Sequence, residues 1–152
     1  KAPEMIRYSL KNENADSSAQ NIQIRNGSYT FNVRIKGYDV KDVVLNMGGM
    51  HNIENAVAAI TVAKHVGIND EKIRNAVATF KGVKRRFEYV IKTDQLVMID
   101  DYAHHPEELR ALITGAKKLF EGKKCTVVFQ PHLFSRTKDH ADGFAEVLGM
   151  AD

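Results

Sequence analysis

The spacing of apolar residues changes at Gly48, and this change restricts the folds open to the chain. Before Gly48, residues 21–35 alternate apolar and polar side chains with period two, as half-buried strands do. Asn26-Gly27 separates the two apolar runs and predicts a tight hairpin turn. Residues 43–47 predict one more short strand. We therefore expect an antiparallel sheet with one solvated face.

Two helices are predicted after Gly48. Residues 69–80 predict the second of them, with Asn69 or Asp70 as its N-cap and acidic residues in its first turn. Residues 51–67 predict the first helix, and Gly67 suits the left-handed backbone conformation that often ends a helix. Its apolar side chains form one helical stripe, made of Ile53, Val57, Ile60, Ala63 and Val66.

The second half of the chain predicts strands and helices in alternation. Residues 87–92 and 96–99 predict a hairpin, and a helix is expected from Pro106 to about Phe120. The apolar run 125–130 predicts a buried parallel strand, residues 131–137 a loop, and the remainder a final helix. This order predicts an α/β fold with a right-handed parallel crossover, the start of a doubly wound sheet. The basic segment 82–86 is the predicted linker.

Composition excludes several classes of protein. Charged residues make up 27% of the chain and hydrophobic residues 43%, so disorder throughout is not expected. A net charge of +3 is too small to indicate nucleic acid by itself. No apolar run approaches the roughly 18 residues of a membrane span. Cys125 is the single cysteine and lies in an apolar run, which predicts a reduced core residue and a cytoplasmic protein. Both ends look cut, which predicts a piece excised from a longer protein.

Two polar loops follow the predicted strands 96–99 and 125–130. Ligands bind at the carboxyl ends of parallel strands, so we expect both loops at one rim. The alternative is that both are ordinary solvated loops. A zinc site from His104, His105 and His132 is a weaker alternative, because no CxxC or HExxH spacing supports it. The candidate site residues are Asp100, Asp101, Tyr102, His104, His105, His132, Ser135 and Arg136.

Two further groups could contact a nucleotide. His51 and Asn55 lie four residues apart at a helix start, with Asn52 beside them, and amides there can read a base edge. The plain alternative makes Asn52 a cap and His51 a loop residue. The segment "KGVKRRFE" includes Arg86 and suits phosphate, or is a solvated basic linker. A phosphate-binding P-loop is missing, because "GAKKLFEGKK" has the wrong spacing and no Ser or Thr after the lysine.

Four motifs together resemble the Mur ligases: "GMHNIENAVAA", "FKGVKRRFE", "DDYAHHPEEL" and "FQPHLFSRT", in that order. The double histidine and the QPH loop resemble the branch that joins L-alanine to UDP-N-acetylmuramate. The resemblance spans nearly the whole chain. It implies that residues 1–82 are the end of an ATP-binding central domain. Residues 83–152 would then begin a Rossmann-like C-terminal domain with a parallel sheet.

The resemblance also implies roles for single residues. His51, Asn52 and Asn55 resemble adenine contacts, Arg86 the arginine that reaches the ATP phosphates, and Asp101 the acid that binds the ribose hydroxyls. Residues around the amino acid and the muramoyl end would be Tyr102, His104, His132 and Arg136, with Arg86 and His104 the catalytic candidates. ATP and Mg²⁺ are the implied cofactors, bound mostly by parts of the parent outside this chain, and no metal ligand is assigned here.

One departure from the family pattern concerns substrate binding. A basic residue commonly follows the QPH histidine, and this chain has Leu133 there. Two alternatives remain open: a recycling relative that attaches a preformed peptide to the same sugar acid, and a basic nucleic-acid-binding module. Without a P-loop the chain alone is expected to be inactive.

Overall fold

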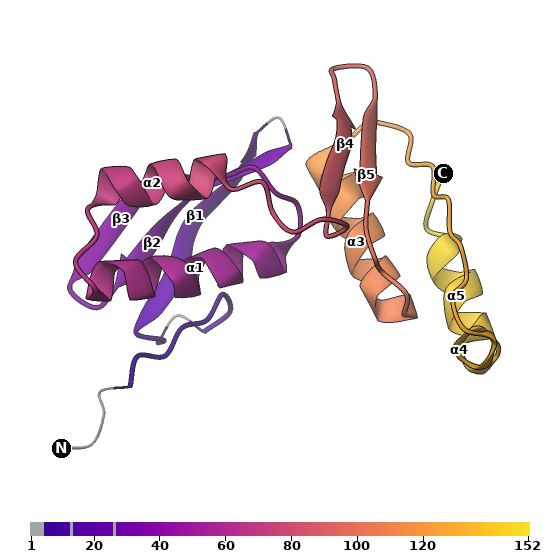
Figure 1. The fold of residues 1–152 in the computed structure, drawn as a ribbon, viewed down its shortest axis with the longest axis horizontal. Coiled ribbons are helices and arrows are strands. Elements are labelled where there is room, and N and C mark those ends of the chain that lie inside the picture. Colours follow the sequence, from indigo (N-terminus) through magenta and orange to yellow (C-terminus); the bar gives the residue numbers. More distant parts are fainter. Residues whose placement is uncertain (1–4, 13, 26) are drawn as a thin grey trace. The chain divides into compact units, whose positions relative to one another are not determined.

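The computed structural model describes residues 5–12, 14–25 and 27–152, and it divides into two compact units, Lys1–Lys81 and Gly82–Asp152. Figure 1 shows the helices and strands of each unit. Each unit is described by itself.

The first unit contains an antiparallel sheet in the order β1-β2-β3. Its strands are β1 (Ser17–Arg25), β2 (Ser28–Ile35) and β3 (Tyr38–Leu45). The predicted hairpin is confirmed: Arg25 pairs with Ser28, and Gly27 has a φ of 70° between them, while Asn26 lies outside the described residues. The third strand is longer than the predicted 43–47. A bulge at Asp42, where φ is 56°, breaks the period-two pattern and hides the first half of this strand from sequence analysis.

Helices α1 (Met50–His65) and α2 (Asp70–Thr79) pack on this sheet, α1 on β1 and β2 and α2 on β3 (Figure 1). Ile53, Val57 and Ile60 are fully buried, as the predicted stripe requires. Val66 is the exception at 65% exposed, because α1 ends at His65 and Val66 is its C-cap. Asn69 is confirmed as the N-cap of α2, since its side chain accepts a hydrogen bond from the backbone N–H of Lys72.

Two side-chain clusters join the sheet to the helices. The Ser17 hydroxyl lies 2.7 Å from the Thr61 hydroxyl, and Thr61 donates to the carbonyl of Val57, all within the buried core. At the other end of the unit, Tyr38 and Lys64 both donate to Asp70, at 2.5 Å and 2.8 Å. In the described part of the chain no buried side-chain nitrogen or oxygen lacks a hydrogen-bond partner.

The second unit begins with a hairpin of β4 (Glu88–Lys92) and β5 (Val97–Asp100), as predicted. The turn is closed by Thr93, whose N–H and hydroxyl both donate to the carbonyl of Leu96. Helix α3 (Pro106–Leu119) follows, with Pro106 at its first position as predicted and His105 as its N-cap. Glu107 and Glu108 stand in its first turn, where carboxylates complement the positive end of the helix.

The predicted parallel strand at 125–130 is not formed in the described part of the chain. Strands β4 and β5 pair antiparallel with each other, and residues 126–130 make no backbone hydrogen bond to any residue that the structure describes. Only Cys125 at the start of the run pairs with other backbone, accepting from the N–H of Asp152 at 2.9 Å. The segment is nevertheless extended, because Cys125, Val127 and Phe129 are half-buried while Val128 between them is 96% exposed.

Helix α4 (Phe134–Asp139) corrects the prediction of a loop over 131–137. It has six residues and buries none of them, so it leaves no apolar stripe for sequence analysis to detect. The predicted last helix is confirmed as α5 (Ala141–Leu148), which buries Phe144 and Val147 against Leu109 and Ile113 of α3.

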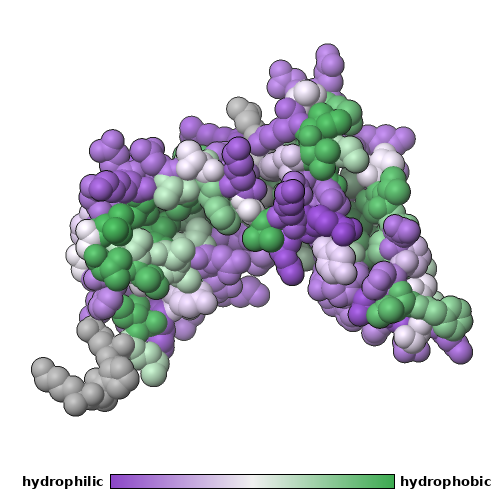
Figure 2. All heavy atoms as spheres, viewed as in Figure 1, coloured by the Kyte–Doolittle hydropathy of each residue, from purple (hydrophilic) through white to green (hydrophobic). Residues whose placement is uncertain are grey.

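Apolar side chains also reach the surface, as Figure 2 shows in green. One group lies where α1 ends and the chain turns toward α2, and it includes Val62, Val66 and Ile68. No helix in the described ranges is long and apolar enough to cross a membrane.

Candidate functional site

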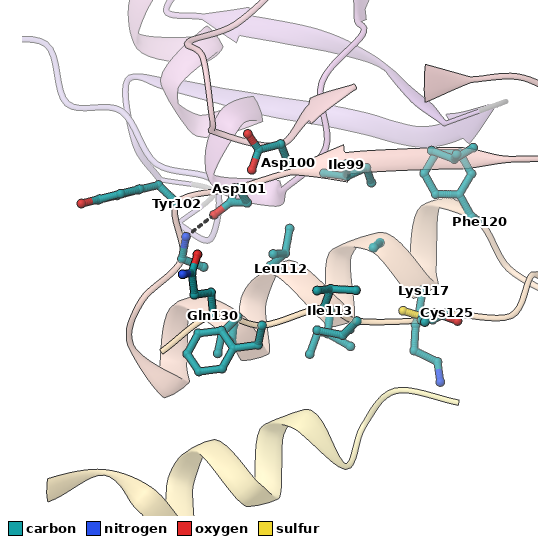
Figure 3. A pocket seen from close by; sticks show the side chains of 18 of the residues that line it. Ile99, Asp100, Asp101, Tyr102, Leu112, Ile113, Lys117, Phe120, Cys125 and Gln130 are labelled. Carbon is teal, nitrogen blue, oxygen red and sulfur yellow. Dashed lines mark hydrogen bonds between the residues drawn. The ribbon is translucent and has the colours of Figure 1, made fainter. Parts of the chain in front are cut away.

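The loop that follows β5 holds two neighbouring carboxylates in different ways. Asp100 and Asp101 leave the strand end on opposite sides, as consecutive residues of a strand do (Figure 3). Asp100 lies 3.7 Å from the guanidinium of Arg85 in an exposed ion pair. Asp101 instead accepts two backbone hydrogen bonds of 2.7 Å, from Ala103 to Oδ1 and from Phe87 to Oδ2. Asp101 is therefore fixed, whereas Asp100 makes a solvent-screened contact.

Residues 85–87, called the strap below, lie against this loop. The N–H of Tyr102 donates to the carbonyl of Arg85 at 2.8 Å, and the Arg85 guanidinium stands 4.9 Å from the centre of the Tyr102 ring. Phe87 is only 5% exposed and meets the Tyr89 ring edge to face at 5.7 Å. Arg86 between them is exposed, and its side chain has no ion-pair partner among the residues that the structure describes.

His104 is oriented by its own loop. Its Nδ1 lies 2.9 Å from the carbonyl of Tyr102, and since a carbonyl only accepts, Nδ1 carries the proton. In the neutral form of the ring, the other nitrogen, Nε2, therefore carries the lone pair and can accept a proton. Glu108 is 3.5 Å from the same ring. The backbone N–H of His104 donates to Glu108 and lowers the pKa of that carboxyl below its ordinary value. This arrangement is one in which His104 can act as a general base.

His105 belongs to different surroundings. It caps α3, and its ring packs against that of His140 with the centroids 4.6 Å apart. A separate small pocket is lined by His105 and His140, whereas His104 and His132 line the larger cavity described next. His104, His105 and His132 therefore do not come together as ligands of one zinc ion. In the described ranges no three His, Cys, Asp or Glu residues are placed to hold a metal ion.

Both polar loops open onto one cavity of about 920 Å³ (Figure 3). Its floor is apolar and comes from α3, and its sides come from β5 and residues 125–130. Five of the eight residues predicted at a shared rim thus line one cavity, whereas His105, Ser135 and Arg136 do not. The polar residues at that end of the cavity are Arg85, Asp100, Asp101, Tyr102, His104, Gln130 and His132.

Some predicted site residues lie elsewhere. Arg136 is half-buried in α4 and does not line the cavity, and Arg86 belongs to the strap. Leu133 has a φ of 68° and redirects the chain between His132 and α4. Sequence analysis assigned no role to Arg85 or Gln130. Arg85 was visible only as one of several basic residues, and Gln130 only as the end of an apolar run.

The third predicted group lies in the first unit, at the start of α1. His51 and Asn55 are exposed on successive turns, while Asn52 donates to the carbonyl of Gly48 at 2.6 Å and closes the turn before the helix. Gly49 has a φ of 88°, and a Cβ there would come within 2.5 Å of the His51 ring. Glycine is favoured at this position mainly by its left-handed φ, which other residues rarely adopt, and an added side chain would also displace the exposed His51 ring.

Comparison with known proteins places both units in one family. The model of the Mur ligase middle domain matches residues 1–63, and that of the Mur ligase glutamate ligase domain matches residues 85–152. A UDP-N-acetylmuramate–L-alanine ligase of Flavobacterium johnsoniae is 48% identical over 141 residues, which are 93% of this chain and 31% of that protein. The corresponding ligase of Christiangramia forsetii is 47% identical, with the same shares of each chain covered.

A solved structure agrees with these relatives. The UDP-N-acetylmuramate–alanine ligase of Thermotoga maritima has a TM-score of 0.80 at 30% identity, over 97% of this chain and 32% of that one. The chain spans about a third of the length of the relatives it matches. The two family models together cover most of it, one in each unit. The chain therefore belongs to the Mur ligase family.

Proposed function

We propose that the chain is part of an ATP-dependent ligase that joins L-alanine to UDP-N-acetylmuramate. The observation that supports this most is the shared rim, where Asp101, His104 and His132 line one cavity within a sequence 48% identical to a protein of that name. In this proposal residues 1–82 are the end of the ATP-binding central domain. Residues 83–152 begin the C-terminal domain. We place the parent in the cytoplasm, where its nucleotide substrates are made.

The proposed reaction is amide formation through an acyl phosphate. ATP phosphorylates the muramate carboxylate, and the amine of L-alanine displaces phosphate to form the amide. Mg²⁺ would neutralise charge on the phosphates, held largely by residues outside this chain. Attack requires the amine within roughly 3–3.5 Å of the acyl carbon, so most of the protein's contribution is positioning.

The proposed nucleotide contacts use residues of both units. His51, Asn52 and Asn55 would contact adenine, Arg86 the phosphates and Asp101 the ribose. A carboxylate has about four acceptor positions, and two of those on Asp101 are taken by backbone N–H groups. The remaining two suit the two hydroxyls of a ribose. The exposed guanidinium of Arg86 suits an incoming phosphate, because it has no carboxylate partner among the residues that the structure describes.

The proposed substrate contacts lie around the cavity rim. Tyr102, His104, His132 and Arg136 would surround L-alanine and the muramoyl end. His104 is placed to take the proton that the ammonium of L-alanine must lose before attack, since its Nδ1 proton is held by Tyr102 and Nε2 is left to accept. Leu133 contributes no charge, so the alanine carboxylate would depend on Arg136.

The same proposal includes the predicted parallel sheet, which the described residues do not form by themselves. The alternating exposure of residues 125–130, their unpaired backbone in the described chain, and the apolar walls of the cavity all suit pairing with further strands. Those strands would come from the rest of the C-terminal domain.

The test is ligation by an intact ligase that contains these residues. Phosphate release with ATP and UDP-N-acetylmuramate should require L-alanine, and a tripeptide should not replace it. Preference for the tripeptide would instead identify the recycling relative. The chain alone should give no turnover, since it lacks a P-loop. Binding of DNA or RNA that weakens steeply with salt would favour the nucleic-acid alternative.

A further inference from the structure

The strap, residues 85–87, has an unusual backbone. Arg85 has a φ of 58° and Phe87 a φ of 50°, both in the left-handed region that non-glycine residues avoid. For a bulky aromatic residue such as Phe87 this is a true outlier. Two such residues on either side of Arg86 persist only where surrounding contacts hold them.

Asp101 holds the Phe87 end of the strap. Its Oδ2 accepts from the N–H of Phe87 and its Oδ1 from the N–H of Ala103, so one carboxylate joins the strap to the loop after β5. Both distances are 2.7 Å, short values that suit hydrogen bonds to an ionised acceptor. The N–H of Tyr102 completes the connection by donating to the carbonyl of Arg85.

Two further hydrogen bonds hold the backbone of the strap: the N–H of Arg86 donates to the carbonyl of Val83 at 3.1 Å, and the N–H of Arg85 donates to Glu88 at 2.8 Å. The neighbours of Arg86 on either side are held by Asp101 and Tyr102, while the Arg86 side chain itself is exposed and has no ion-pair partner in the described part of the chain. The direction in which Arg86 leaves the backbone is therefore set by the conformations of Arg85 and Phe87. Weakening either contact would let the strap relax and turn Arg86 away.

We propose that Asp101 is a positioning residue that sets the direction of Arg86, beyond any contact it makes with a nucleotide. The benefit of a fixed Arg86 rests on the proposed function, whereas the contact between Asp101 and the strap does not. The same carboxylate can do both, because its backbone bonds leave two acceptor positions unused. Loss of the Asp101 charge would thus affect phosphate binding even where no ribose hydroxyl is present.

The contact is tested by NMR on this chain. Asp101→Asn leaves one acceptor oxygen for two donors, so the amide protons of Phe87 and Ala103 should shift upfield. Their exchange should accelerate about 10- to 150-fold, the loss expected for a hydrogen bond to a charged group. Asp100→Asn is the matched control, since it removes the adjacent carboxylate but neither bond, and both amides should stay protected. Unchanged amides in Asp101→Asn would overturn the proposal.

Two further measurements guard against a simple folding defect. Amides of α3 and α5, which lie in the same unit as Asp101 but donate no hydrogen bond to it, should keep their exchange rates in the variant. Should Asp101→Asn unfold the second unit, Asp101→Glu keeps both oxygens and should restore part of the protection at Phe87 and Ala103. Failure of Asp101→Glu to restore any would count against the proposal.

Kinetics in an intact ligase separate positioning from ribose binding. With 2′,3′-dideoxy-ATP a purely ribose-binding Asp101 has nothing to contact, so Asp101→Asn would cost nothing. If Asp101 is a positioning residue, Asp101→Asn should lower kcat by the same factor with ATP and with the dideoxy analogue. It also predicts that Asp101→Asn costs little more once Arg86→Ala is present. Additive losses would overturn the proposal, whereas a wild-type enzyme that ligates no L-alanine would refute only the proposed function.

Discussion

The buried hydroxyl pair of Ser17 and Thr61 gives a stability prediction whose size follows from the direction of the hydrogen bonds. Thr61 has one hydroxyl proton, and it is donated to the carbonyl of Val57 at 2.7 Å. The 2.7 Å contact between the two hydroxyls must therefore use the proton of Ser17. Ser17 is fully buried and Thr61 is 7% exposed, so water cannot replace either partner.

Thr61→Val keeps the shape of the side chain and removes the acceptor. The Ser17 proton is then buried without a partner, which should lower the free energy of unfolding by about 1–3 kcal/mol. Ser17→Ala removes the donor and leaves the Thr61 proton on Val57, so it should cost only about 0.5–1.5 kcal/mol. In the double variant no hydroxyl is left unpaired, and its cost should be smaller than the sum of the two.

The assay is urea unfolding followed by far-ultraviolet circular dichroism, together with exchange of the slowest amides of β2 and α1. The amide measurement reports the first unit alone, so a separate transition of the second unit does not confuse it. Equal costs for the two single variants, or costs that add in the double variant, would refute the assigned direction of the bonds.

Three more predictions follow from the packing and charges. Hydrogen bonds from Lys64 and Tyr38 hold the pKa of Asp70 below its ordinary value, so their stabilisation is present above the ordinary aspartate pKa and lost as pH falls below it. Acid titration of Asp70→Asn should lack this contribution, and an unchanged acid profile would contradict it. Ile113→Ala should cost about 2–5 kcal/mol by urea unfolding, whereas Val128→Ala, at a 96% exposed position, should stay within about 0.5 kcal/mol. Amides 126–130 should exchange freely in this chain at low concentration and be protected in an intact ligase; equal protection in both would remove the proposed strand pairing.

Sequence analysis predicted the elements whose signals are local. The β1–β2 hairpin, the N-cap at Asn69 and the start of α3 at Pro106 each depend on a few adjacent residues, and all are confirmed. The strand predicted at 125–130 is not formed in the described chain, because a strand needs a neighbour and an apolar run does not show whether one is present. The helix α4 was missed because it buries no residue.

The candidate site shows the same limit. Topology alone predicted that the loops after β5 and after residue 130 share a rim. The separation of His105 from His104 was not predictable, because it depends on the packing of His105 against His140. Nor was the partner of Asp101 at Phe87, which is 14 residues away in the sequence. The roles of individual residues in nucleotide and substrate binding stay predictions.

The extended run 125–130 also affects how this chain behaves in solution. The backbone of residues 126–130 makes no backbone hydrogen bond within the described chain, and Val128 adds an exposed apolar side chain to this segment. Such a segment is a template for another chain. Two copies of the chain can pair their extended segments through backbone hydrogen bonds, so self-association should rise with protein concentration. A charged residue in place of Val128 is the simplest way to keep the chain monomeric.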